Sequence, residues 1–180
     1  MQIILVRHPQ PLVAPGVCYG RTDLAVAPSE LERVRAALSA SLPHDAPMYS
    51  SPLRRCAELA ASLPSASLAF DARLVEIDFG AWEMRRWDDI ERAEIDAWAE
   101  DTVGYRPGGG ESVLQMAARV AAFHADLLQA DHRQAVVICH AGTMRLLAAR
   151  NKGLAPAEMA LHAARTPHQI AYGATLLLAY

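Results

Sequence analysis

The sequence predicts an α/β fold, specifically a three-layer α/β/α sandwich around a mostly parallel central sheet. Two short aliphatic runs, at residues 1–6 and 135–139, are unbroken and rich in β-branched side chains. Such runs are typical of strands buried on both faces of a sheet. Predicted strands and helices alternate along the chain, as they do where helices cover both faces of a parallel sheet. With 180 residues and 52% hydrophobic composition, a single domain spanning residues 1–180 is expected.

The first half of the chain contains three predicted strands. After the first strand and Pro9, prolines and glycines break both helical and strand periods and predict a loop at 10–23. Ser29 is a candidate N-cap for a helix that ends before Pro43. The other elements predicted in this half are a strand at 47–51, a helix opened by Pro52 and ending near Pro64, and a strand at 68–70.

The second half begins with a segment unlike a core element. Residues 74–83 mix acids, aromatics and a glycine, which indicates a functional loop, and Trp82 and Trp87 are candidates for a substrate-pocket wall. The elements predicted after this loop are helices at 87–100, 113–130 and 144–149, a strand at 135–139, and a final strand at 171–180 that closes the sheet.

Composition excludes several classes of function. The net charge is −3, and no run of Lys or Arg is long enough to follow a nucleic-acid backbone. No apolar stretch approaches the ~20 residues that span a bilayer, and no signal-peptide pattern is present, so a soluble cytoplasmic protein without a membrane partner is expected. Three widely spaced cysteines fit reduced thiols. Metal-ligand spacing is absent, so we expect catalysis without a metal or cofactor. The sequence does not decide the oligomeric state, and a homodimer is compatible with it.

An imidazole follows each of the two aliphatic strands, and a guanidinium group follows the first. Arg7 and His8 come directly after the first, and His140 follows the second in a turn at 140–143 that leads into the helix predicted at 144–149, with Thr143 at the N-terminus of that helix. The carboxyl ends of parallel strands meet at one edge, so these groups form an anion pocket there. Arg54 and Arg55 begin another helix at the same edge, and only one of two neighbouring helical positions faces inward. These donors favour a phosphoryl group, which a neutral imidazole can attack in line.

A leaving alkoxide needs a proton, and three loop carboxyls are candidates to supply it: Glu76, Asp78 and Glu83. Arg21, in the loop at 10–23, is a further candidate to bind a phosphate or a substrate hydroxyl. The remaining histidines are expected at the surface: His44, His124, His132, His162 and His168.

Six blocks occur in the order seen in a known family: Arg7-His8, CYGRTD at 18–23, SSPLRR at 50–55, EIDFGAWE at 76–83, GGES at 109–112 and CHAGT at 139–143. Together they resemble the histidine phosphatase superfamily, which also contains the cofactor-dependent phosphoglycerate mutases. The resemblance implies a phosphoglycerate mutase-like fold and phosphomonoester hydrolysis through a phosphohistidine. It implies His8 as nucleophile, Glu76 as proton donor, and Arg7, Arg55 and His140 around the phosphate. The loop at 16–23 is most similar to the α-ribazole phosphatases, which implies α-ribazole 5′-phosphate as substrate.

Departures from the family pattern keep alternatives open. Pro9-Gln10 replaces a glycine and an acid after the nucleophile, and proline removes an amide donor. Ala14 replaces the asparagine of many mutases, which favours hydrolysis over mutase-type transfer, and Ala141 replaces a commoner glycine. The spacing from Cys139 to Arg145 suggests a different class, the cysteine phosphatases. In that class a histidine usually precedes the cysteine, whereas Ile138 stands there in this chain. A phospholigand-binding protein without turnover is a third alternative.

Overall fold

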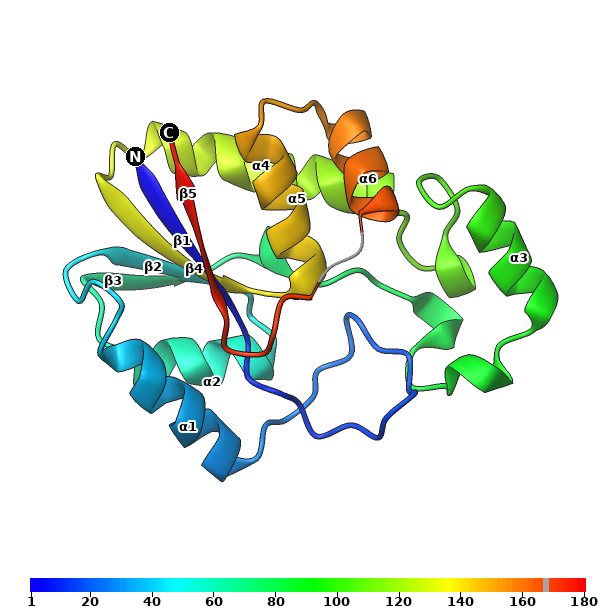
Figure 1. Cartoon of the computed structure of the whole chain (residues 1–180), viewed down its shortest axis with the longest axis horizontal. Helices are drawn as coiled ribbons and strands as arrows, with labels where there is room; N and C mark the ends of the chain where they lie inside the picture. Colours follow the sequence, from blue (N-terminus) through cyan, green and yellow to red (C-terminus); the bar gives the residue numbers. More distant parts are fainter. Residues whose placement is uncertain (167–168) are drawn as a thin grey trace.

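The computed structural model describes residues 1–166 and 169–180 and contains one five-stranded sheet (Figure 1). The strand order is β3-β2-β4-β1-β5. The strands are β1 (Gln2–Arg7), β2 (Pro47–Ser50), β3 (Ser67–Phe70), β4 (Gln134–Cys139) and β5 (Thr175–Ala179). All neighbours pair in parallel except β5, which runs antiparallel to β1 at the edge. The predicted mostly parallel sheet is therefore confirmed.

The two aliphatic strands lie at the centre of the sheet, where both faces are covered. Ile3 pairs with Ala135 and Val6 with Ile138. Because side chains alternate along a strand, Ile3 packs into the core on one face while Val6 packs into the core on the other. At the antiparallel edge, by contrast, Leu177 is 57% exposed.

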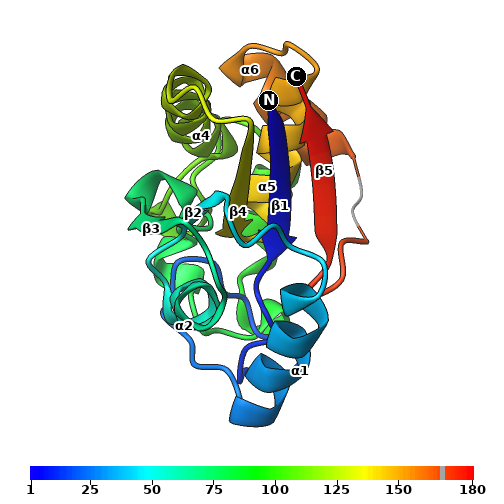
Figure 2. The ribbon, with the colours of Figure 1, turned by 90° about the vertical axis from the view of Figure 1, so that its left-hand side faces the viewer.

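Helices cover both faces and complete the predicted three layers (Figures 1 and 2). The helices are α1 (Pro28–Ser39), α2 (Arg54–Ser62), α3 (Arg92–Glu100), α4 (Val113–Gln129), α5 (Ala141–Asn151) and α6 (Pro156–Arg165). Helices α4, α5 and α6 pack on one face, and α1 and α2 on the other. Helix α3 stands away from the sheet and packs beside Trp82 and Ile90. In the part of the chain described, no helix combines the length and apolar character needed to cross a bilayer.

Several predicted helix boundaries are wrong. Helix α1 begins at Pro28, and Ala27 replaces Ser29 as its N-cap because proline fits the first helical turn. Helix α2 begins at Arg54 rather than at Pro52. Leu53 has an extended backbone, and its amide donates to the hydroxyl of Ser51. Helix α5 begins directly after His140, three residues earlier than expected.

The second half departs from expectation in three further places. The helix predicted at 87–100 is divided, because Ile90 adopts an extended conformation and is buried beside Trp82. Helix α6 was not predicted, and the last strand covers only Thr175–Ala179. The expectation of one domain over residues 1–180 stays a prediction.

Candidate active site

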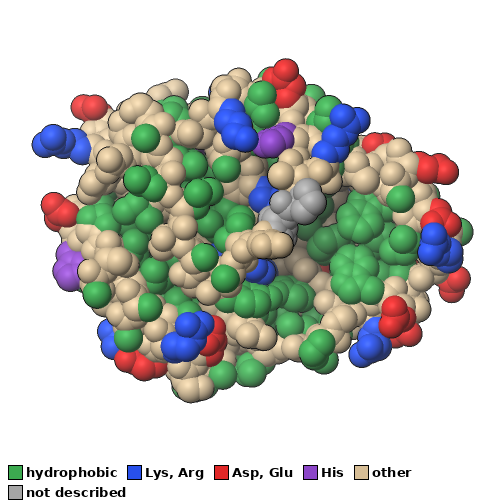
Figure 3. Space-filling model, viewed as in Figure 1, with side chains coloured by type: hydrophobic (Ala, Val, Ile, Leu, Met, Phe, Trp, Pro, Cys, Tyr) green, Lys and Arg blue, Asp and Glu red, His purple; other side chains and the backbone are tan. Residues whose placement is uncertain are grey.

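A pocket of about 670 Å³ opens beyond the carboxyl ends of β1 and β4. One side is polar, with Arg7, His8, Arg55 and Glu76 contributing to its lining. The rest is largely hydrophobic, and Figure 3 shows hydrophobic side chains around a hollow on this face. The edge predicted from the sequence is therefore where the pocket lies.

His8 is 2% exposed and held in one tautomer. Its Nδ1 lies 2.7 Å from the carbonyl oxygen of Pro9. Because a carbonyl only accepts, Nδ1 carries the proton and donates it, which leaves the lone pair on Nε2. Pro9, which departs from the family pattern, thus supplies the acceptor that sets this tautomer.

His140 lies beside His8, with 5.0 Å between the ring centroids. Its Nδ1 accepts from Nε of Arg55 at 3.3 Å, and its Nε2 lies 2.8 Å from the hydroxyl of Ser51. Ser51 and Arg55 both follow β2, so the segment after one strand orients the imidazole that follows another.

Both imidazoles are neutral near pH 7. Burial, and then the charges of Arg55 and Arg7, lower the pKa of His8 well below its ordinary value, against the bond to Pro9. Burial lowers the pKa of His140 likewise, with His8 and Arg55 adding to the effect. A neutral imidazole is the form that can act as a nucleophile.

Arg55 is the inward-facing member of its pair. Its side chain is fully buried, and NH1 and NH2 donate to the carbonyls of Thr22 and Gly20, the first at 2.7 Å. Arg54 instead points outward and forms an ion pair with Glu58 at 2.9 Å. The guanidinium of Arg55 therefore joins the first loop to His140.

Glu76 is the loop carboxylate that reaches the pocket. Its Oε2 accepts from the amide of Gly142 at 2.9 Å, and Oε1 accepts from the amide of Ile77 at 3.0 Å. Asp78 lies 3.6 Å from Arg21 and does not line the pocket. Among the three candidate carboxyls, only Glu76 is therefore placed to line the pocket.

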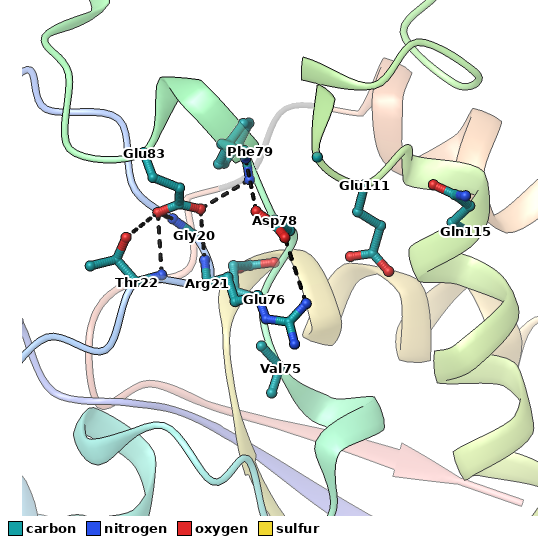
Figure 4. Close-up of polar contacts among 12 residues, drawn as sticks. Gly20, Arg21, Thr22, Val75, Glu76, Asp78, Phe79, Glu83, Glu111 and Gln115 are labelled. Atoms are coloured by element: carbon teal, nitrogen blue, oxygen red, sulfur yellow. Dashed lines mark hydrogen bonds and ion pairs between the residues drawn. The ribbon is translucent and has the colours of Figure 1, made fainter. Parts of the chain in front are cut away.

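Glu83 organises the two loops rather than facing the pocket (Figure 4). Its carboxylate accepts from the amides of Gly20, Arg21, Thr22 and Phe79 and from the hydroxyl of Thr22. Burial raises the pKa of Glu83, but these hydrogen bonds outweigh it and the pKa is lowered. Glu83 is therefore an ionised acceptor that fixes loop 20–22 against loop 79–83.

Two predicted substrate-binding side chains do not reach the pocket. The side chain of Arg21 is 66% exposed and faces Asp78. Thr143 is fully buried, and its hydroxyl donates to the carbonyl of Leu74 at 3.2 Å. The first turn of α5 instead presents Ala141 and Gly142 to the pocket.

A family model described as histidine phosphatase superfamily, branch 1, matches residues 3–170. The chain belongs to the histidine phosphatase superfamily. It is 33% identical over 120 residues to the adenosylcobalamin/alpha-ribazole phosphatase of Escherichia coli K12, an alignment that spans 59% of each chain.

Two solved structures of phosphatases show the same fold. The alpha-ribazole phosphatase of Shigella flexneri has a TM-score of 0.80 at 26% identity, covering 98% of this chain and 89% of that chain. A mycobacterial glucosyl-3-phosphoglycerate phosphatase in complex with VO3 has a TM-score of 0.74 at 25% identity, covering 89% and 86%. The phosphoglycerate mutase-like fold is therefore confirmed.

The cysteine-phosphatase alternative finds no support in this histidine phosphatase. Cys139 is fully buried at the end of β4, and burial raises its pKa well above the ordinary value. Arg145 donates to the carbonyls of Ala163 and Thr166 on and after α6. A reactive thiolate is absent because the strand that delivers His140 points the neighbouring thiol into the core.

The pocket also contains aromatic side chains that the sequence only partly indicated. Trp87 lines it as expected, but Trp82 is fully buried and donates through Nε1 to Glu94. Trp98 and Phe79 line it as well, and the rings of Trp87 and Trp98 are parallel to within 6° with centroids 6.1 Å apart. The sequence signal for this aromatic wall is the three-residue spacing of Ile95 and Trp98, which places both side chains on one face of α3.

The other histidines do not contribute to the pocket in the described residues. His124 was expected at the surface but is 3% exposed, with Nε2 2.6 Å from the hydroxyl of Tyr180. His168 lies outside the described residues. Within residues 1–166 and 169–180, no group of three or more His, Cys, Asp and Glu side chains is arranged to hold a metal ion.

Proposed function

We propose that the protein is a phosphomonoesterase that hydrolyses a small phosphorylated metabolite through a phosphohistidine on His8. The observation that carries the proposal is the tautomer of His8, whose Nδ1 is committed to Pro9 while its ring lies 5.0 Å from that of His140. The unprotonated Nε2 is then the nucleophile, and the guanidinium groups of Arg7 and Arg55 supply positive charge.

In the first step, His8 Nε2 attacks phosphorus in line, and the P–N bond forms as the P–O bond to the leaving group breaks. Arg7, Arg55 and His140 stabilise the equatorial oxygens. Glu76 acts as the general acid and gives a proton to the leaving oxygen. In the second step, Glu76 takes a proton from water, which attacks phosphorus and releases inorganic phosphate and free His8.

For the substrate, we propose α-ribazole 5′-phosphate. The flat benzimidazole base of this ester matches the hydrophobic wall formed by Phe79, Trp87 and Trp98. The E. coli and Shigella relatives, which are named as phosphatases of this compound, support the same choice.

The proposal is tested with purified protein, without added metal, on α-ribazole 5′-phosphate, 3-phosphoglycerate, phosphoserine and p-nitrophenyl phosphate. The highest kcat/KM is expected for α-ribazole 5′-phosphate. Isomerised phosphoglycerate in place of free phosphate would instead indicate a mutase. Binding of phosphate without any product would indicate a non-catalytic phospholigand-binding protein.

The nucleophile is tested with a pair of variants. His8→Ala is expected to abolish phosphate release, because no other group can form the covalent intermediate. Cys139→Ser is the matched control and is expected to retain most of the activity. The reverse pattern would transfer the assignment to the thiol. Trapping label from a radioactive phosphate ester on the wild type, but not on His8→Ala, would establish the phosphohistidine directly.

A further inference from the structure

The side chain of Arg7 is held without a carboxylate among the described residues. NH1 donates to the carbonyl of Ile170, and the guanidinium carbon lies 3.9 Å from the centroid of the Tyr172 ring. Nε is buried and has no hydrogen-bond partner in the described part of the chain. An aromatic face orients a cation without neutralising it, so Arg7 keeps its charge for an anion.

Tyr172 is itself pinned to the segment that contains the nucleophile. The amide of Gly173 donates to the carbonyls of Arg7 and His8, at 3.1 and 3.3 Å, and the amide of Arg7 donates to the carbonyl of Ala174 at 2.9 Å. Gly173 has a φ of 73°, a left-handed conformation that glycine adopts without strain. This turn brings the Tyr172 ring to 5.5 Å from the His8 ring, centroid to centroid.

The hydroxyl of Tyr172 reaches across to the first loop. It lies 2.8 Å from the hydroxyl of Tyr19, a residue that lines the pocket. The ring of Tyr19 in turn lies 5.6 Å from the guanidinium carbon of Arg55. Two tyrosines from opposite ends of the chain therefore span the distance between the two pocket arginines.

We propose that Tyr172 is a positioning residue for phosphate recognition, which holds Arg7 through its ring and Tyr19 through its hydroxyl. The inference rests on the proposed function for its role in turnover, but the phosphate site it describes can be tested by binding alone. The ring orients Arg7, and the hydroxyl orients the loop that supports Arg55.

The test compares Tyr172→Leu, which removes the aromatic face, with Tyr172→Phe, which keeps it. Binding of inorganic phosphate is measured by calorimetry, and kcat and KM are measured with p-nitrophenyl phosphate. Tyr172→Leu is expected to weaken phosphate binding and raise KM by about 10-fold, with a smaller change in kcat. Tyr172→Phe is expected to bind phosphate about 3-fold more weakly than wild type, because it keeps the aromatic face over Arg7 and loses only the hydroxyl contact to Tyr19. The matched controls are Tyr180→Leu and Tyr180→Phe, away from the pocket, with no change expected.

A double-mutant cycle with Arg7→Met, which removes the cation over the Tyr172 ring, distinguishes positioning from a general packing role. If Tyr172 acts through Arg7, Tyr172→Leu costs little further affinity once Arg7 is methionine, whereas additive losses would overturn the proposal. Wild-type phosphate affinity in a folded Tyr172→Leu variant would also overturn the proposal. If the leucine variant does not fold, Tyr172→Met replaces it in the same comparison. Failure of the wild type to hydrolyse any ester would contradict the proposed function, while the binding comparison would still decide the role of Tyr172.

Discussion

The backbone amide of Gly142 donates a hydrogen bond of 2.9 Å to Oε2 of Glu76. Gly142 lies in the first turn of α5, two residues after His140, so one helix start fixes the carboxyl relative to the imidazole. A Cβ at position 142 would lie 2.3 Å from Oε1 of Glu76. No side chain at position 142 is compatible with this placement of the carboxyl.

Gly142→Ala is therefore expected to displace Glu76 and lower kcat by about 100-fold, the lower end of what a general acid contributes. The melting temperature should change little, because the displaced carboxyl can turn toward the pocket. Ala141→Gly, one residue earlier in the same turn, is the matched control and should retain activity. Unchanged kcat in Gly142→Ala would show that Glu76 does not act from this position.

Glu83→Gln is expected to destabilise the protein by about 2 kcal/mol, because an amide nitrogen then faces backbone donors. The measurement is urea unfolding at neutral pH. Glu32→Gln is the control on the exposed surface, where the partner is Arg35, and should destabilise the protein much less than Glu83→Gln.

The pH dependence of the Glu83 contribution follows from its lowered pKa. A carboxyl whose pKa is lower in the folded state stabilises the fold above its unfolded pKa and loses this contribution as the pH falls through the folded value. The difference in unfolding free energy between wild type and Glu83→Gln should therefore shrink as the pH falls below about 4.5. A difference that grows in acid would contradict this account.

His8 and His140 are expected to remain neutral from about pH 8 to about pH 6, because burial lowers the pKa of both. Their ring proton shifts in NMR spectra should stay constant over this range. A midpoint near the ordinary histidine value for His8 would contradict a preformed neutral nucleophile, and the same result for His140 would contradict the effect of burial on that ring.

His124 is expected to make the fold sensitive to acid, because burial lowers its pKa to about 4. The unfolded chain binds a proton at this position below about pH 6.5 and the folded chain does not, so stability falls as the pH falls through this window. His124→Gln should give a shallower decline in unfolding free energy between about pH 6.5 and about pH 4. Parallel curves for the two proteins would contradict the prediction.

Trp98→Ala is expected to raise KM for α-ribazole 5′-phosphate by about 10-fold, because one ring of the aromatic wall is lost. KM for phosphoserine, which has no ring to place against the wall, should change little. Phe70→Ala, an exposed aromatic on the edge strand β3, is the control. Equal effects on both esters would mean that the wall does not contact the leaving group.

The local pattern of this sequence was sufficient to predict the sheet and the sheet edge at which the pocket lies. Ile3, Leu5 and Val6 of the first strand and residues 135–139 of the second are buried, with side chains on both faces of the sheet. Polar groups directly after such strands have only the carboxyl edge to occupy. His8, His140 and the inward-facing Arg55 could be expected there because each position depends on its own strand or helix. Helix α6 has local signals of its own, with Pro156 in its first turn and buried Met159, Ala160 and Ala163 at helical spacing. The interruption at Ile90 depends instead on packing beside Trp82, which local spacing does not show.

Only the tertiary structure decided which carboxyl reaches the pocket and how the imidazoles are held. Glu76, Asp78 and Glu83 lie within eight residues of one another and look equivalent in the sequence. Their different environments come from Gly142, Arg21 and the amides of loop 20–22, all distant along the chain. Likewise, Tyr172 meets Tyr19 across 153 positions. Contacts of this kind depend on how the chain packs in three dimensions, which local residue spacing does not encode.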